Sequence, residues 1–164
     1  MDNWEKDSKV FWHLTAASCA HVVEEYFWPG GFLEAAREVA PEAFENASLP
    51  IIVGVNASMI AGCALGAMRR KKDPSFGLSM ASLLFFNALL HLGASLKARK
   101  YVPGLVTGLA LYVPLATRAF SAYWRSGKYR FSTTIRAAVQ GMALHSIPFV
   151  AFAVRGALQK RKGQ

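Results

Sequence analysis

The chain has 164 residues, enough for one domain; 53% of them are apolar and only 18% are charged, against about 25% in soluble domains. Its net charge of +9 comes from lysine and arginine clusters that flank apolar runs, which favours contact with anionic headgroups over nucleic-acid binding. The composition thus predicts an all-α bundle of membrane-spanning helices. The lipid bilayer is its expected partner, and residues 1–164 are expected to form one integral membrane domain.

Five apolar segments are long enough to cross a bilayer, which takes about 20 mostly apolar residues. We expect helices at about 10–28, 49–68, 76–96, 102–124 and 133–157, with a kink at Pro148 in the last. The first segment contains histidine and glutamate and is the least apolar. A re-entrant or interfacial first helix is therefore the structural alternative.

Residues 31–48, between the first two segments, carry a shorter amphipathic pattern. Apolar side chains recur at helical spacing, at Phe32, Leu33, Ala36 and Val39. The pattern predicts a short amphipathic helix at the membrane surface. Such a helix would either cover a site formed by the first segment or serve as a solvated connector, and the connector is the simpler interpretation.

The first segment ends with an unusual group of polar residues, since His21 is followed by Glu24 and Glu25. A charged side chain inside a spanning helix costs roughly 2.5–3.5 kcal/mol, so two adjacent carboxylates there indicate a function. Residues three and four apart share one helix face, which places His21 beside both carboxylates. This grouping suits a metal ion or a proton relay. The plainer interpretation is that His21 hydrogen-bonds one glutamate while the other reaches the interface.

An aromatic-Pro-Gly-Gly sequence, residues 28–31, follows this motif, and an Asn-x-x-x-His pattern is formed by Asn87 and His91. In both motifs and in their order the chain resembles the HXXEE-domain family of small helical membrane proteins, over about residues 10–155. The resemblance implies a shared site that joins His21, Glu24 and Glu25 to Asn87 and His91. It implies no particular reaction, because the family is largely without an assigned activity.

One more histidine and two aromatic residues complete the candidate site. His145 is a third histidine inside an apolar segment, so we expect it to join the ligands. Trp28 and Tyr101 are expected to contact the substrate; for Tyr101 this is implied by the resemblance, and an interfacial anchor is its ordinary explanation. His13 lies two turns before His21, about 12 Å along the helix, which is too far to share the site.

Two GxxxG pairs, Gly62 with Gly66 and Gly104 with Gly108, predict close helix packing. The packing would lie either within the bundle or in a homodimer. With five spans, the cationic residues are divided almost equally between the two sides of the membrane, so the positive-inside rule does not orient the chain. The acidic segment 31–48 favours a cytoplasmic amino terminus.

These residues predict a site for one divalent transition metal ion, and imidazole with carboxylate ligation suits Zn, Fe or Mn. The expected ligands are His21, Glu24, Glu25, His91 and His145, and the expected catalytic groups are Glu24, Glu25 and Asn87. Such a site is reached from the bilayer, so we expect a metal-dependent hydrolase or oxidoreductase acting on a lipid or isoprenoid-like substrate. The alternatives are a metal-free acid–base isomerase or cyclase using Glu24 or Glu25, and a non-enzymatic lipid-binding protein or carrier.

Overall fold

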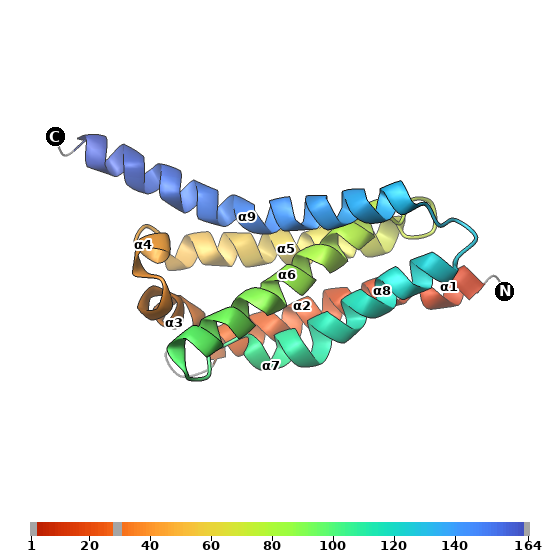
Figure 1. The fold of residues 1–164 in the computed structure, drawn as a ribbon, viewed down its shortest axis with the longest axis horizontal. Coiled ribbons are helices and arrows are strands. Elements are labelled where there is room, and N and C mark those ends of the chain that lie inside the picture. Colours follow the sequence, from red (N-terminus) through yellow and green to blue (C-terminus); the bar gives the residue numbers. More distant parts are fainter. Residues whose placement is uncertain (1–2, 28–30, 163–164) are drawn as a thin grey trace.

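The computed structural model describes residues 3–27 and 31–162, which form a bundle of helices (Figure 1). The described residues contain no strand, so the predicted all-α fold is confirmed. In chain order the elements are α1 (Asn3–Asp7), α2 (Val10–Phe27), α3 (Gly31–Val39), α4 (Pro41–Phe44), α5 (Leu49–Arg69), α6 (Ser75–Ala98), α7 (Leu105–Thr107), η1 (Gly108–Tyr112), α8 (Val113–Arg125) and α9 (Phe131–Lys162).

Of the described residues, four stretches are long and apolar enough to cross a membrane. They are α5, α6, the helix over 105–125 that joins α7, η1 and α8, and the part of α9 from Phe131 to Leu158. α2 is less apolar because its buried face carries His21 and Glu25. Its 18 residues nevertheless extend about 27 Å, close to the ~30 Å of a hydrocarbon core. The prediction of about five membrane helices agrees with the fold when α2 is counted.

The two ends of the bundle are formed by different segments of the chain (Figure 1). One end holds α1, residues 70–74 and residues 126–130, and we call it the basic end for its lysine and arginine residues. The other holds α3, α4 and residues 99–104, and we call it the site end because α2 reaches it with the His21 motif. At the basic end the buried Trp4 donates from Nε1 to the carbonyl of Arg70 at 3.3 Å, which fastens α1 to the bundle.

α6 lies at the centre and contacts α5, α8, η1 and α9. Small residues permit this crowding. A Cβ at Gly66 of α5 would lie 2.8 Å from Cα of Gly77, and one at Gly108 of η1 would lie 3.3 Å from Cα of Ala88. One glycine from each GxxxG pair thus brings a helix backbone against α6 within one chain. A homodimer through the same motifs stays a prediction.

The fourth and fifth segments differ in detail from the predicted ones. α7 begins at Leu105 rather than at 102, because the residues before it form a turn in which Gly104 has a φ of +95°. The π-helix η1 was not indicated by any sequence pattern, and such helices are frequent at functional sites. α9 continues through Pro148 to Lys162, beyond the predicted end at 157, and bends near its middle (Figure 1).

Candidate metal centre

Three buried side chains from two helices converge towards the site end. α2 supplies His21 and Glu25, one turn apart, and α6 supplies His91. Oε1 of Glu25 lies 3.4 Å from Nε2 of His21 and 3.3 Å from Nε2 of His91. One ligand atom from each residue lies within 4.8 Å of the other two, and the described part of the chain has no other such group of three.

The spacing of these atoms fits a metal ion. Ligand atoms about 2.1 Å from a tetrahedral ion lie roughly 3.4 Å apart. His21 and His91 are fully buried and Glu25 is 5% exposed, yet Nε2 of each histidine has no hydrogen-bond partner. Buried polar atoms without partners are rare and call for an explanation. An ion held between the three side chains would give both Nε2 atoms a partner, whereas Nδ1 of His91 would still have none.

Glu25 is fixed by a partner on a third helix. Nδ2 of Asn56, on α5, donates to Oε2 of Glu25 at 2.7 Å, which leaves Oε1 facing the two histidines. Hydrogen bonds of this kind orient metal-binding carboxylates. Asn56 was missed by sequence reasoning, although an asparagine inside an apolar helix is itself a signal of a buried polar contact.

Glu24 does not join the group, contrary to the sequence prediction. Its oxygens accept hydrogen bonds from the backbone N–H groups of Gly104 (3.0 Å), Val106 (3.0 Å) and Thr107 (2.7 Å). The hydroxyls of Tyr101 and Thr107 also donate to it. The carboxylate thus caps the start of the helix over 105–125, where free N–H groups need acceptors. With both oxygens so engaged, Glu24 is a positioning residue rather than a ligand.

Thr107 connects Glu24 to His21. Its hydroxyl donates to Oε2 of Glu24 at 2.5 Å and lies 2.8 Å from Nδ1 of His21. A hydroxyl has one proton to donate, so Nδ1 of His21 carries the hydrogen of the second bond. A ring with its one hydrogen on Nδ1 has its lone pair on Nε2, the atom that faces Glu25. This is the tautomer that a metal ligand requires.

Tyr101 also donates to Glu24, and its predicted contact with the substrate stays a prediction. Burial, and then the hydrogen bond to the Glu24 carboxylate, raise the pKa of Tyr101, so the phenol stays protonated and donates at neutral pH. Trp28, the other predicted substrate contact, lies outside the described residues. The aromatic rings that pack against the histidines of the centre are those of Tyr112 and Phe32.

Gly104 lets the backbone close one side of the centre. Its φ of +95° is one that other residues rarely adopt. A Cβ there would lie 2.6 Å from Nδ1 of His91 and 2.8 Å from Cε1 of His21. Any side chain at this position would press on both rings, so a glycine is needed for the turn to pack against them.

Aromatic rings close two further sides. The ring of Tyr112, on η1, lies 4.5 Å from that of His21, and the ring of Phe32, on α3, lies 4.9 Å from that of His91. α3 crosses the site end of the bundle (Figure 1). The amphipathic segment therefore covers the centre, and the interpretation of it as a solvated connector was wrong.

A cavity of about 600 Å³ extends from the centre between α5, α6 and α9. Its polar lining includes Glu25, Asn56, Asn87 and His145, and its remaining walls are mostly apolar. Along α6 the lining runs from Leu90 to Phe76, a rise of about 21 Å. The cavity is thus elongated, and among the three ligand residues it is Glu25 that lines it.

Two predicted site residues line this cavity instead of joining the three ligand atoms. Oδ1 of Asn87 is buried and has no hydrogen-bond partner, one turn before His91 on α6. His145 packs its ring 5.6 Å from that of Phe149 on α9. Both face the space beside the centre rather than the centre itself. His13 is exposed on the outer side of α2, far from the cluster from which it was excluded.

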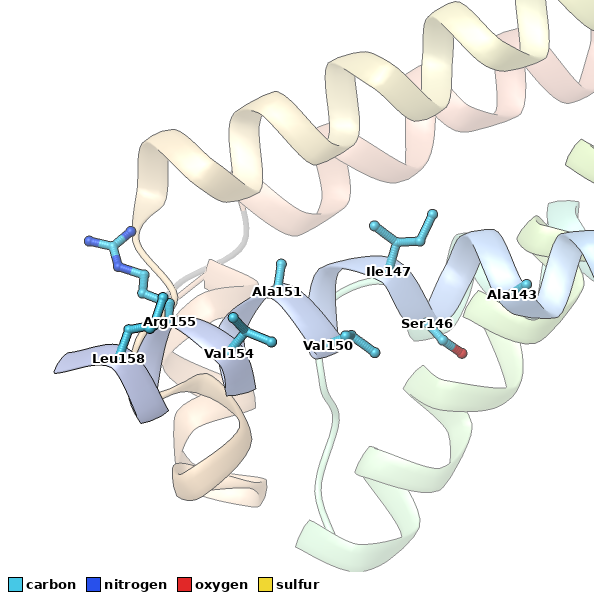
Figure 2. Close-up of a pocket in the computed structure, with 8 residues that line it drawn as sticks. All are labelled: Ala143, Ser146, Ile147, Val150, Ala151, Val154, Arg155 and Leu158. Atoms are coloured by element: carbon cyan, nitrogen blue, oxygen red, sulfur yellow. The ribbon is translucent and has the colours of Figure 1, made fainter. Parts of the chain in front are cut away.

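A second hollow, of about 670 Å³, lies along α9 (Figure 2). Its eight lining residues all belong to this helix, and they include Ile147, Val150, Val154 and Leu158. Ser146 and Arg155 are the polar ones. A hollow so apolar suits lipid chains against the outside of a membrane helix and offers no cluster of reactive groups.

A family model described as a protein of unknown function with HXXEE motif matches residues 12–119. The chain belongs to the HXXEE family. The HXXEE match contains His21, Glu25 and His91 together with Asn56 and the turn that binds Glu24, and it is shorter than the expected 10–155. It ends before α9, so the third cavity wall lies outside it. No curated protein and no solved structure matches the chain.

Proposed function

We propose that this HXXEE protein binds a divalent transition metal ion through Nε2 of His21, Nε2 of His91 and one carboxylate oxygen of Glu25. The supporting observation is that these buried atoms lie at ligand spacing while neither nitrogen makes a hydrogen bond within the chain. Two imidazoles and a carboxylate suit Zn, Fe or Mn and leave a position open for substrate. A bound ion would supply Lewis-acid chemistry or, if it is iron, oxidation.

The substrate of the proposed metal-dependent enzyme is a lipid or isoprenoid-like molecule. A cavity of about 600 Å³ has the size of a small-molecule site. Its polar side chains lie beside the centre, since Asn56 binds Glu25 and Asn87 lies one turn from His91. Gly62, Phe76 and Met80 line its far part. This layout suits a molecule with one polar group at the centre and an apolar chain along α6.

Two side chains of the cavity have roles in this proposal. Oδ1 of Asn87, which has no partner, accepts a hydrogen bond from a hydroxyl or N–H of the substrate. His145, on the opposite wall, gives or takes a proton at the polar group. Glu25 holds the ion, and Glu24 acts only through Thr107 and the turn before it.

A metal-free acid–base enzyme is the second candidate, because Glu25 lies between two imidazoles. A carboxyl group in that position is suited to passing a proton to an apolar substrate. Glu24 is not assigned this role, because five donors already engage its two oxygens. Metal content separates the two candidates.

The deciding experiment is elemental analysis of the full-length protein, purified without a histidine tag or chelators. The wild type is compared with His91→Ala and with His13→Ala, a matched control that removes an exposed histidine. We expect about one Zn, Fe or Mn per chain in the wild type and in the control, and a loss of most metal from His91→Ala. Full occupancy in His91→Ala would refute the centre as drawn, and no metal in any sample would favour the acid–base enzyme.

The cavity is tested by the lipids that purify with the protein. Val55 lines the cavity, whereas Val53, on the same helix, is 49% exposed and lines no part of it. We expect mass spectrometry to detect a bound single-chain lipid in the wild type and in Val53→Trp. We expect Val55→Trp to lack that lipid. Equal lipid content in the two variants would argue against the cavity as the substrate site.

A further inference from the structure

A cleft of about 420 Å³ lies at the basic end, remote from the metal centre. It is formed by the loop before α6, the loop before α9 and the first turns of α9. Its cationic side chains are Lys72, Lys128, Arg130 and Arg136. His91 is 16 residues beyond the start of α6, about 24 Å along that helix, so the cleft and the centre are separate sites.

The positive charge of the cleft is largely uncompensated. Among the described residues, the lysines and arginines that form ion pairs with carboxylates are Lys71 and Lys100, and neither lines the cleft. Asp73 is the one carboxylate in the lining. Four cationic side chains therefore line the cleft together with one carboxylate. Most of the exposed glutamates lie at the site end of the bundle.

The carboxylate of Asp73 is hydrogen-bonded to the backbone. Its Oδ1 accepts a hydrogen bond from the N–H of Ser75 at 2.9 Å. Hydrogen bonds from Ser75, with a smaller contribution from the nearby Arg136 charge, lower the pKa of Asp73. The carboxylate is thus ionised and offsets one of the four cations, while its bound oxygen points to the start of α6.

Two long helices begin beside the cleft and add to its positive potential. α6 starts at Ser75 and α9 at Phe131, and neither has an acidic residue in its first turn. Helix starts carry partial positive charge from free N–H groups. Because Asp73 already accepts from the first N–H of α6, it is mainly the start of α9 that reinforces the four cationic side chains, and it is not itself the reason for the assignment.

We propose that this cleft binds a phosphate-bearing anion, with Arg130 and Arg136 as its main contacts. Guanidinium groups bind phosphate oxygens in pairs, and lysines add point charge. The cleft lies where four candidate spans end or begin, which is the level of lipid headgroups. The phosphate belongs either to an anionic lipid or to a free phosphate compound, and the two sources are distinguished by experiment.

The test uses the full-length protein in neutral detergent and follows its thermal unfolding. Phosphatidylglycerol, phosphatidylcholine and inorganic phosphate are titrated into the wild type, into Arg130→Gln/Arg136→Gln and into Lys97→Gln/Arg155→Gln. The last variant removes two exposed cations outside the cleft and is the matched control. All three proteins are expected to fold, because each substituted side chain is exposed.

We expect phosphatidylglycerol, but not phosphatidylcholine, to raise the unfolding temperature of the wild type and the control. In Arg130→Gln/Arg136→Gln the apparent affinity is expected to fall roughly tenfold or more, since each cation near a membrane contributes substantially to anion binding. Stabilisation by inorganic phosphate as well would identify a free phosphate compound. Wild-type affinity in the cleft variant, or no stabilisation by either anion, would overturn the proposal.

Discussion

Thr107 shows how one hydroxyl can set the state of a buried histidine. It donates to Glu24 and accepts from Nδ1 of His21, so the His21 ring presents its other nitrogen to the centre. Without this hydroxyl, the Nδ1–H of His21 would lose its partner and the tautomer would no longer be fixed. Loss of this hydroxyl is expected to weaken ion binding rather than to unfold the protein, because Thr107 is only half-buried.

We expect Thr107→Val to weaken metal binding about 10- to 100-fold, the usual effect of losing a hydrogen-bond partner behind a ligand. Thr107→Ser keeps the hydroxyl and should bind like the wild type. The measurement is competition with a chelator of known affinity, with circular dichroism as the check on folding. Equal affinities of the valine and serine variants would show that Thr107 has no part in fixing His21.

Single residues of the centre were predictable to different degrees. His21 and Glu25 lie one turn apart on one helix, so their spacing alone placed them together. His91 is placed in the site by the Asn-x-x-x-His motif and the family resemblance rather than by helix spacing. The bonds of Asn56 and Thr107 join residues 31 and 86 positions apart, and the sequence does not show which polar residues meet across helices. For the same reason the sequence predicts Glu24 as a ligand, although its partners lie on the turn before α7.

At the scale of elements, the turn before α7 is held from both sides. Glu24 binds its amides, and Gly104 lets it approach His21 and His91. The sequence predicts that the fourth helix begins at 102, because apolar residues start there. The positive φ of Gly104 is not helical, so the helix begins only after it. The π-helix that follows sets Tyr112 against His21, and hydropathy carries no information about it.

Gly104→Ala is expected to destabilise the protein by about 1–3 kcal/mol from the backbone conformation alone, and the contact of its Cβ with His91 and His21 adds to this. Gly93→Ala is the matched control: it lies in α6 with nothing within 4 Å of an added Cβ, and it should be neutral or slightly stabilising. Unfolding in detergent, followed by tryptophan fluorescence, compares the two. Similar stability of both variants would contradict the close packing of the turn.

At the scale of the whole molecule, α2 determines how many times the chain crosses the membrane. Four other stretches are apolar enough on their own, while α2 buries its polar face against the bundle and leaves Trp12, Val23 and Phe27 outside. That division suits a helix with lipid on one side and protein on the other. Hydropathy marked α2 as the weakest span because it averages over both faces.

We expect α2 to cross the bilayer, with the amino terminus in the cytoplasm and the carboxyl terminus on the opposite side. Reporter proteins fused to each end, active on one side of the membrane only, measure this directly. Termini on the same side would mean that α2 lies at the interface and that the chain has an even number of spans. If the reporter is partly active at each of the two termini, the protein inserts in both orientations.

The hydrogen bonds that Glu24 accepts from the turn before α7 also bear on when α2 can enter the membrane during synthesis. α2 leaves the ribosome about 80 residues before the amides of Gly104 and Thr107 that bind this carboxylate. Until then Glu24 lacks these partners and has only water to hydrate it, and a charge inside the bilayer is costly. We therefore expect the nascent α2 to stay at the membrane surface and to enter together with residues 102–125. A ribosome that stalls before Gly104 would leave the first helix outside the bilayer.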